Sequence, residues 1–165
     1  AHLVPDIVAS LARHALAPER LVLELTESLV MRDPVTTRER LSQLKGIGVS
    51  IAIDDFGTGY SSLATIHDYP VDVLKVDRSF LTRLETRPND EALLRAILDL
   101  GQALSLRTVV EGIETAEQLA LVRRLGARRG QGWHLGRPVP AAALAALLAA
   151  TDADVVSTPP VATAA

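Results

Sequence analysis

Two adjacent carboxylates, Asp54 and Asp55, follow a short apolar run and precede Phe-Gly-Thr-Gly in the stretch SIAIDDFGTGYSSL. Ionisable residues also lie at or near the C-terminal end of three other strand-like segments: Glu24 in LVLELTE, Lys75 in VLKVD and Glu111 in RTVVEG. In a parallel sheet, open or closed into a barrel, the C-terminal ends of the strands carry the chemistry. We therefore expect these side chains to share one site.

Any one of these acids has an ordinary interpretation, because an acidic residue after a strand is usually a solvated loop residue or a helix N-cap. For Glu24 or Glu111 alone that interpretation is favoured. A cluster is different, since buried unpaired charge is costly and neighbouring carboxylates repel one another. A divalent cation removes both costs, and oxygen ligands without cysteine suit Mg²⁺ or Mn²⁺.

Lysine is rare in this chain and occurs only as Lys45 and Lys75. Lys45 follows a helical pattern, where a cation stabilises the C-terminal end of the helix dipole. Lys75 lies inside a strand. There its ammonium either contacts phosphate or a metal-bound hydroxide, or it forms a salt bridge to Asp77 or a neighbouring carboxylate. The residue pattern leaves both alternatives open.

Strand-like and helix-like segments alternate, and this predicts a parallel sheet with right-handed crossovers. The expected strands are 21–25, 49–54, 71–76, 107–111 and 127–132, the last being the weakest because it has no β-branched residue. The expected helices cover 2–16, 34–46, 89–104 and 115–126, with Asp33 and Thr115 as N-caps and a Thr115–Gln118 capping box. No dinucleotide or P-loop fingerprint is present. Five strands are too few for a complete (β/α)₈ barrel, so the chain is either part of a barrel or another α/β fold.

Composition excludes several classes of protein. The chain has 165 residues, a net charge of −3 and no cysteine, which excludes disulfides and thiolate metal sites. It has no basic stripe typical of DNA or RNA binding. Its longest apolar stretch, PVPAAALAALLAA, is too short to span a membrane, and no signal peptide is evident, so we expect a soluble, cytoplasmic protein. Residues 1–150 are expected to form the domain and 151–165 a disordered tail.

Five motifs, ELTES, DDFGTGYSSL, LKVDRSF, VVEGIET and QGWHLGRPV, occur in this order and at these separations between Leu3 and Leu148. Together they resemble the EAL-domain phosphodiesterases, which hydrolyse the bacterial second messenger cyclic di-GMP. The resemblance implies a TIM-barrel-like α/β fold, two Mg²⁺ or Mn²⁺ ions, and linear pGpG as the product.

The resemblance also assigns roles to individual residues. It implies that Glu24, Asp54 and Asp55 bind the metals, with Asp54 bridging them and Asp55 on the second ion. Lys75 matches the lysine that contacts the attacking water and the carboxylates. Glu111 matches the glutamate beside the second metal, and Gln131 a polar residue near the water.

Further residues match supporting positions. Glu27 matches the glutamate that anchors the loop 56–60, Glu114 a nearby supporting carboxylate, and the loop itself part of a homodimer contact. Upstream sensory or GGDEF domains are expected in the parent protein.

The Glu-Ala-Leu motif of the family and the asparagine of the following strand are absent from this sequence. Both belong to a segment before His2, so we expect a domain that is incomplete at its N-terminus. The leading hypothesis is a cyclic di-GMP phosphodiesterase. The alternatives are an inactive EAL-derived module that binds the nucleotide or a protein partner, and another metal-dependent TIM-barrel hydrolase.

Overall fold

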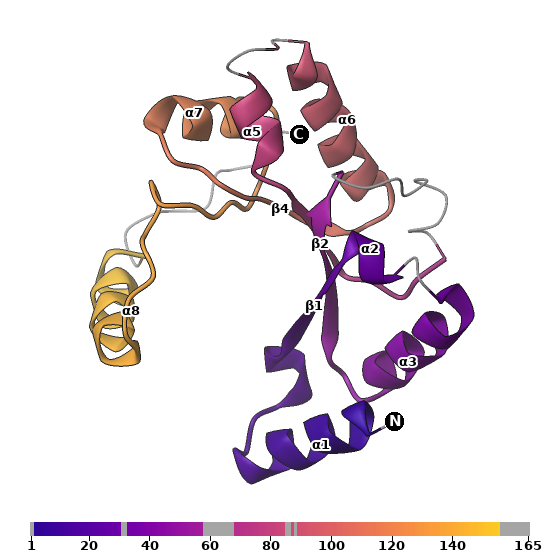
Figure 1. Ribbon diagram of the computed structural model, residues 1–165. Helices are drawn as coiled ribbons and strands as arrows, with labels where there is room; N and C mark the ends of the chain where they lie inside the picture. Colours follow the sequence, from indigo (N-terminus) through magenta and orange to yellow (C-terminus); the bar gives the residue numbers. More distant parts are fainter. Residues whose placement is uncertain (1, 31–32, 58–67, 85–86, 88, 156–165) are drawn as a thin grey trace, which may run out of the picture. The chain divides into compact units, whose positions relative to one another are not determined.

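A computed structural model describes residues 2–30, 33–57, 68–84, 87 and 89–155 (Figure 1). The chain divides into two compact units, Ala1–Leu135 and Gly136–Ala165. The first unit contains the sheet and every residue of the predicted site. The second contains helix α8 (Ala141–Val155).

The first unit is built on a four-stranded sheet in the order β1-β2-β3-β4, with every pair of neighbours parallel. The strands are β1 (Val22–Thr26), β2 (Ser50–Phe56), β3 (Val73–Val76) and β4 (Arg107–Val110). This confirms the first four predicted strands and their parallel pairing. The register sets Glu24 beside Ala52 and Lys75 beside Val109, so the predicted site residues lie near one another across the sheet.

The fifth predicted strand, 127–132, is wrong as a strand. The segment makes a single parallel bridge, Val110 to Gly130, flanked by two backbone hydrogen bonds of 3.1 and 2.9 Å that join Val110 to Arg129 and Gln131. Two glycines and no β-branched residue give this segment little intrinsic tendency to extend the ladder. It still runs alongside the end of β4, which is what the site requires.

The four predicted helices are present in the first unit, which also has two short helices and a 3₁₀ turn that had not been predicted. In the first unit they are α1 (Leu3–Arg13), the 3₁₀ turn η1 (Pro18–Arg20), α2 (Glu27–Val30), α3 (Pro34–Gly46), α5 (Ser79–Leu84), α6 (Asp90–Ala103) and α7 (Ala116–Arg124). Asp33 caps α3 by accepting a hydrogen bond of 3.2 Å from the Thr36 N–H. The predicted capping box of Thr115 and Gln118 is present at the start of α7. These caps satisfy N–H groups that the first helical turn leaves unpaired.

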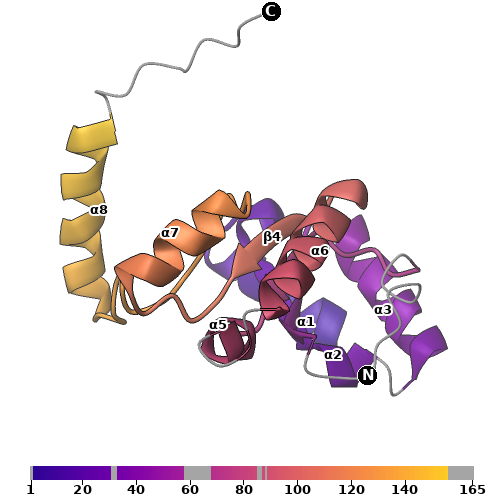
Figure 2. The ribbon, with the colours of Figure 1, turned by 90° about the horizontal axis from the view of Figure 1, so that it is seen from above.

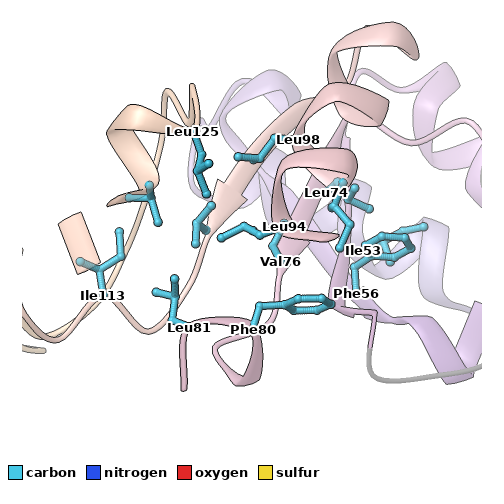
Figure 3. Packing of buried hydrophobic residues seen from close by; sticks show 13 residues of the cluster. Ile53, Phe56, Leu74, Val76, Phe80, Leu81, Leu94, Leu98, Ile113 and Leu125 are labelled. Carbon is cyan, nitrogen blue, oxygen red and sulfur yellow. The ribbon is translucent and has the colours of Figure 1, made fainter. Parts of the chain in front are cut away.

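One face of the sheet packs against the helices. Ile51 of β2 lies in a buried cluster with side chains of α1 and α3. Ile53, two residues later, lies in a second cluster with α5, α6 and α7 (Figure 3). Because side chains alternate along a strand, both clusters lie on the same face of β2. Glu24, Asp54 and Lys75 have the opposite parity to the residues of their strands that pack in these clusters, which are Leu23, Ile51, Ile53 and Leu74, so they project from the other face.

The second unit consists of α8 and the residues around it. The helix continues to Val155, so residues 151–155 of the expected tail are helical, and 156–165 lie outside the described residues. The division into a domain over 1–150 and a disordered tail over 151–165 stays a prediction. Within the part of the chain that the structure describes, no helix is both long and apolar enough to cross a bilayer.

Candidate metal centre

The centre of the site is the ammonium group of Lys75, whose side chain is only 9% exposed. Its Nζ lies 2.7 Å from Glu24 Oε2, 2.9 Å from Asp54 Oδ1 and 2.8 Å from Glu111 Oε1. These carboxylates come from β1, from β2 and from the residue directly after β4. The structure therefore brings together residues up to 87 positions apart around one cation, as the strand-end positions predict.

The carboxylates fix the protonation state of Lys75. Burial alone lowers the pKa of the ammonium, but its interactions with the Glu111, Glu24 and Asp54 carboxylates outweigh that effect and raise the pKa well above its ordinary value. Burial raises the pKa of the Glu111 carboxyl, and Lys75 offsets only part of this rise. Lys75 is accordingly a fixed positive charge at neutral pH.

Asp54 and Asp55 lie at an irregularity in β2. The register between β2 and β3 shifts between Ile53 and Phe56, and Asp55 has a φ of 55°, in the left-handed region. In a regular strand two successive side chains point to opposite faces, but a bulge redirects one of them. As a result, Asp54, Asp55 and Glu111 each offer a carboxylate oxygen within 4.8 Å of the others.

This group of carboxylates fits a divalent cation. Two oxygens bound to one Mg²⁺ or Ca²⁺ at about 2.1–2.6 Å lie at most about 4.2–5.2 Å apart, which agrees with the spacing. Asp54 Oδ1 is buried and has no hydrogen-bond partner among the described residues; its approach to Lys75 is an ion pair without the direction of a hydrogen bond. Glu24, Asp54 and Glu111 together place three carboxylates around one ammonium, so the site carries a surplus of negative charge.

Gln131 and Glu27 support the site from two sides. Gln131 Nε2 donates a hydrogen bond of 2.6 Å to Glu111 Oε1, the oxygen that also contacts Lys75. Glu27, at the start of α2, is 3% exposed, and its Oε2 accepts a hydrogen bond of 2.9 Å from the Gly57 N–H. Gly57 has a φ of +91°, and a Cβ there would collide with the Phe80 ring. Residues 58–60 of the loop expected to be anchored by Glu27 lie outside the described residues.

Among the described residues, Glu114 forms no ion pair with Lys75. Its backbone N–H donates a hydrogen bond of 2.7 Å to Gln118 Oε1 at the start of α7, and its side chain is exposed. The bulge at Asp54–Asp55 and the spacing of the three carboxylates had not been predicted from the sequence. The signal for the bulge was the pair of adjacent acids before a glycine-rich stretch.

Comparison with known proteins agrees with this geometry. The family model for the EAL domain matches residues 2–138. The bifunctional diguanylate cyclase/cyclic di-GMP phosphodiesterase MucR of Pseudomonas aeruginosa is 46% identical over 149 residues, which are 90% of this chain and 22% of MucR.

Solved structures show the same likeness. The MucR phosphodiesterase in complex with c-di-GMP has a TM-score of 0.84 at 46% identity, covering 87% of this chain and 58% of that one. The EAL domain of Mycobacterium smegmatis DcpA has a TM-score of 0.84 at 40% identity, covering 90% and 66%. Klebsiella pneumoniae BlrP1 in a manganese/cy-diGMP complex has a TM-score of 0.74 at 30% identity, covering 78% and 33%.

This chain spans less than a quarter of the length of MucR and just over half of the solved MucR chain. The expected α/β, TIM-barrel-like EAL fold is confirmed for the part that it spans. With its parallel sheet, its strand-end carboxylates and the family match over most of its length, the chain belongs to the EAL domain family.

Proposed function

We propose that this EAL domain belongs to a phosphodiesterase that hydrolyses cyclic di-GMP to linear pGpG with divalent metal ions. The observation that carries the proposal is the arrangement of Asp54, Asp55 and Glu111, whose oxygens lie within 4.8 Å of one another beside the Lys75 ammonium. MucR and BlrP1, both similar to this chain, are described in complexes with cyclic di-GMP, BlrP1 also with manganese.

Glu24, Asp54 and Asp55 would hold the metal, with Glu111 beside it, and we propose two Mg²⁺ or Mn²⁺ ions. Bound there, such ions lower the pKa of a water and neutralise phosphoryl oxygens. In the net reaction, the water oxygen bonds to phosphorus, the bond to a ribose 3′ oxygen breaks, and that oxygen takes up a proton. One of the two phosphodiester links is thereby opened.

Lys75 acts in this scheme as a permanent cation. Its bonds to the carboxylates raise the pKa of the ammonium and so favour the protonated form. The ammonium donates hydrogen bonds, which hold Glu24 and Glu111 in place and present positive charge to the water and the phosphoryl oxygens. Gln131 fixes the orientation of Glu111 through its hydrogen bond of 2.6 Å.

The remaining assignments are proposals of the same kind. The hydrogen bond from Gly57 to the buried Glu27 supports a role for Glu27 in anchoring the loop 56–60, through which we propose a homodimer. We also propose a cytoplasmic protein. The 22% coverage of MucR supports further domains, sensory or GGDEF, in the parent protein.

The test separates metal binding, nucleotide binding and turnover. Conversion of cyclic di-GMP to pGpG is followed by chromatography with Mg²⁺, with Mn²⁺ and with excess EDTA, on the 165-residue chain and on a longer form of the protein. Mn²⁺ affinity is measured in parallel by electron paramagnetic resonance, and cyclic di-GMP affinity by isothermal titration calorimetry. Metal-dependent pGpG formation supports the proposal. Nucleotide binding without turnover in both forms would instead support the inactive binding module.

A further inference from the structure

A pocket of about 640 Å³ lies at the N-terminal end of β4. It is formed by the C-terminal half of α6, the start of β4, and the end of α7 with the segment after it; Figure 2 shows α6 and α7 flanking β4. Arg107, the first residue of β4, lines the pocket, whereas Glu111 of the metal centre follows the last residue of that strand. The pocket and the metal centre therefore lie at opposite ends of β4.

The lining of this pocket is strongly basic. Its charged side chains are one aspartate, Asp99, and five arginines: Arg95, Arg107, Arg124, Arg128 and Arg129. The whole chain has a net charge of −3, yet a third of its fifteen arginines line this one pocket. The local charge of the pocket is therefore opposite in sign to the net charge of the chain.

Little of this positive charge is neutralised by the protein. Arg124 forms an ion pair with Glu91 at 3.4 Å, and both side chains are well exposed. The other four arginines of the pocket have no salt bridge within the described ranges. Arg107 makes a long contact of 3.4 Å with Ser50 Oγ, and its charge acts on the Asp72 carboxylate without forming an ion pair. Like charges held close together repel one another, so this arrangement favours an anion.

We propose that this pocket binds a small polyphosphate anion, either a free phosphate chain or the phosphates of a nucleotide. A guanidinium group presents paired N–H donors that match phosphate oxygens, and several around one concave space favour a ligand with several linked phosphates. The volume lies in the range of small-molecule sites, about 300–1,000 Å³. A concave pocket of this size favours a small molecule over an extended nucleic acid or a flat protein surface.

The proposal is tested by isothermal titration calorimetry of the 165-residue chain with sodium tripolyphosphate and with ATP, in EDTA. Without metal, the carboxylate-rich centre at the other end of the strand repels polyanions, so the measurement reports the arginine pocket. We expect binding by both ligands that weakens as the salt concentration rises. Equal affinities identify the phosphate chain as the ligand, and tighter binding of ATP identifies a nucleotide; either result supports the site if the variants below lose it.

The decisive variant is Arg128→Gln/Arg129→Gln, which should weaken tripolyphosphate binding by at least about tenfold, since each lost guanidinium removes charge-assisted hydrogen bonds to phosphate oxygens. The matched control is Arg20→Gln/Arg123→Gln, which removes two exposed arginines outside the pocket and should leave the affinity unchanged. Gln102→Glu, a change of almost no volume that adds a negative charge to the wall, should also weaken binding.

Circular dichroism establishes that each variant is folded. The proposal is overturned if neither anion binds, if the pocket and control variants bind equally well, or if only acidic peptides or anionic vesicles bind.

Discussion

The two ends of the parallel sheet carry opposite surpluses of charge. At the C-terminal end, three carboxylates surround the single ammonium of Lys75, and Asp55 lies within reach of two of them. At the N-terminal end, five arginines and one aspartate line a pocket beside β4. The same strands thus separate a site suited to cations from one suited to anions.

The other lysine shows what a balanced pair looks like. Lys45, in the last turn of α3, donates a hydrogen bond of 2.6 Å to Asp72 Oδ1, while Asp72 Oδ2 accepts one of 2.8 Å from the Ile51 N–H. Both charges and both oxygens of Asp72 have partners, which is typical of a structural ion pair. Around Lys75 three carboxylates contact one ammonium, and this imbalance supports the proposal of a metal site there.

The largest effect is expected from Asp54→Asn. We propose Asp54 as a metal ligand, and a neutral amide cannot replace a ligating carboxylate. Loss of a residue that only supports a metal ligand costs about 10–100-fold. Turnover of cyclic di-GMP by Asp54→Asn should therefore fall by more than that. Mn²⁺ affinity, measured by electron paramagnetic resonance, should fall with it. Asp72→Asn, the same change at the other end of the sheet, should retain both when assayed well below its unfolding temperature. Near-normal turnover by Asp54→Asn would remove Asp54 from the mechanism.

The two lysines provide the second comparison. Lys75→Arg keeps the charge but replaces a compact ammonium with a planar fork that cannot contact three carboxylates in the same geometry, so turnover should fall by about 100-fold. Lys45→Arg faces a single, partly exposed carboxylate and should leave turnover unchanged. Steady-state kinetics on both variants measure the difference in turnover. Full activity of Lys75→Arg would show that Lys75 serves only as a salt-bridge residue.

Much of this site could be predicted because the period of a strand and the parallel topology act together. Alternation assigns Glu24, Asp54 and Lys75 to one face, and parallel pairing brings their ends to one edge. Gln131 and Glu27 were identified only through the family motifs. Nothing in their local pattern indicates the contacts with Glu111 and Gly57, which depend on tertiary packing.

Two features of the structure could not be predicted from patterns in the sequence. The bulge in β2 requires Asp55 to adopt a left-handed backbone, a choice decided by neighbouring strands rather than by the residue type. The arginine pocket combines residues from α6, β4 and the segment 124–129, and their spacing follows no single period. Conversely, a continuous fifth strand over 127–132 was predicted from the alternation of elements, but glycines at 130 and 132 limit it to one bridge.

We expect the backbone beside the candidate metal centre to tolerate replacement of a glycine less well than the backbone at the other end of the sheet. Gly57→Ala places a Cβ at a φ of +91° and against the Phe80 ring, so we expect a loss of about 2–4 kcal/mol in the free energy of unfolding. Gly46→Ala, at the end of α3, meets no atom within 4 Å and should be neutral or stabilising by up to about 1 kcal/mol. Urea unfolding of both variants measures the difference, and equal stabilities would show that the turn at Gly57 tolerates a side chain.

The smallest effect concerns the balanced ion pair. Burial raises the pKa of Asp72, but hydrogen bonds from Lys45 and Ile51 outweigh it and lower the pKa below its ordinary value. A lowered pKa in the folded state means stabilisation that is complete above the unfolded value and lost as the pH falls through the folded one. Asp72→Asn should therefore lower the free energy of unfolding by about 1–3 kcal/mol at neutral pH, and the difference from the unsubstituted protein should shrink below about pH 4.

The control is Asp68→Asn, which removes an exposed ion pair with Arg38 and should change the free energy of unfolding by less than about 1 kcal/mol. Urea unfolding from neutral pH to below about pH 4 measures the free energy of unfolding of both variants. If the loss of stability of Asp72→Asn does not vary with pH, the hydrogen-bond geometry of Asp72, rather than its charge, stabilises this end of the sheet.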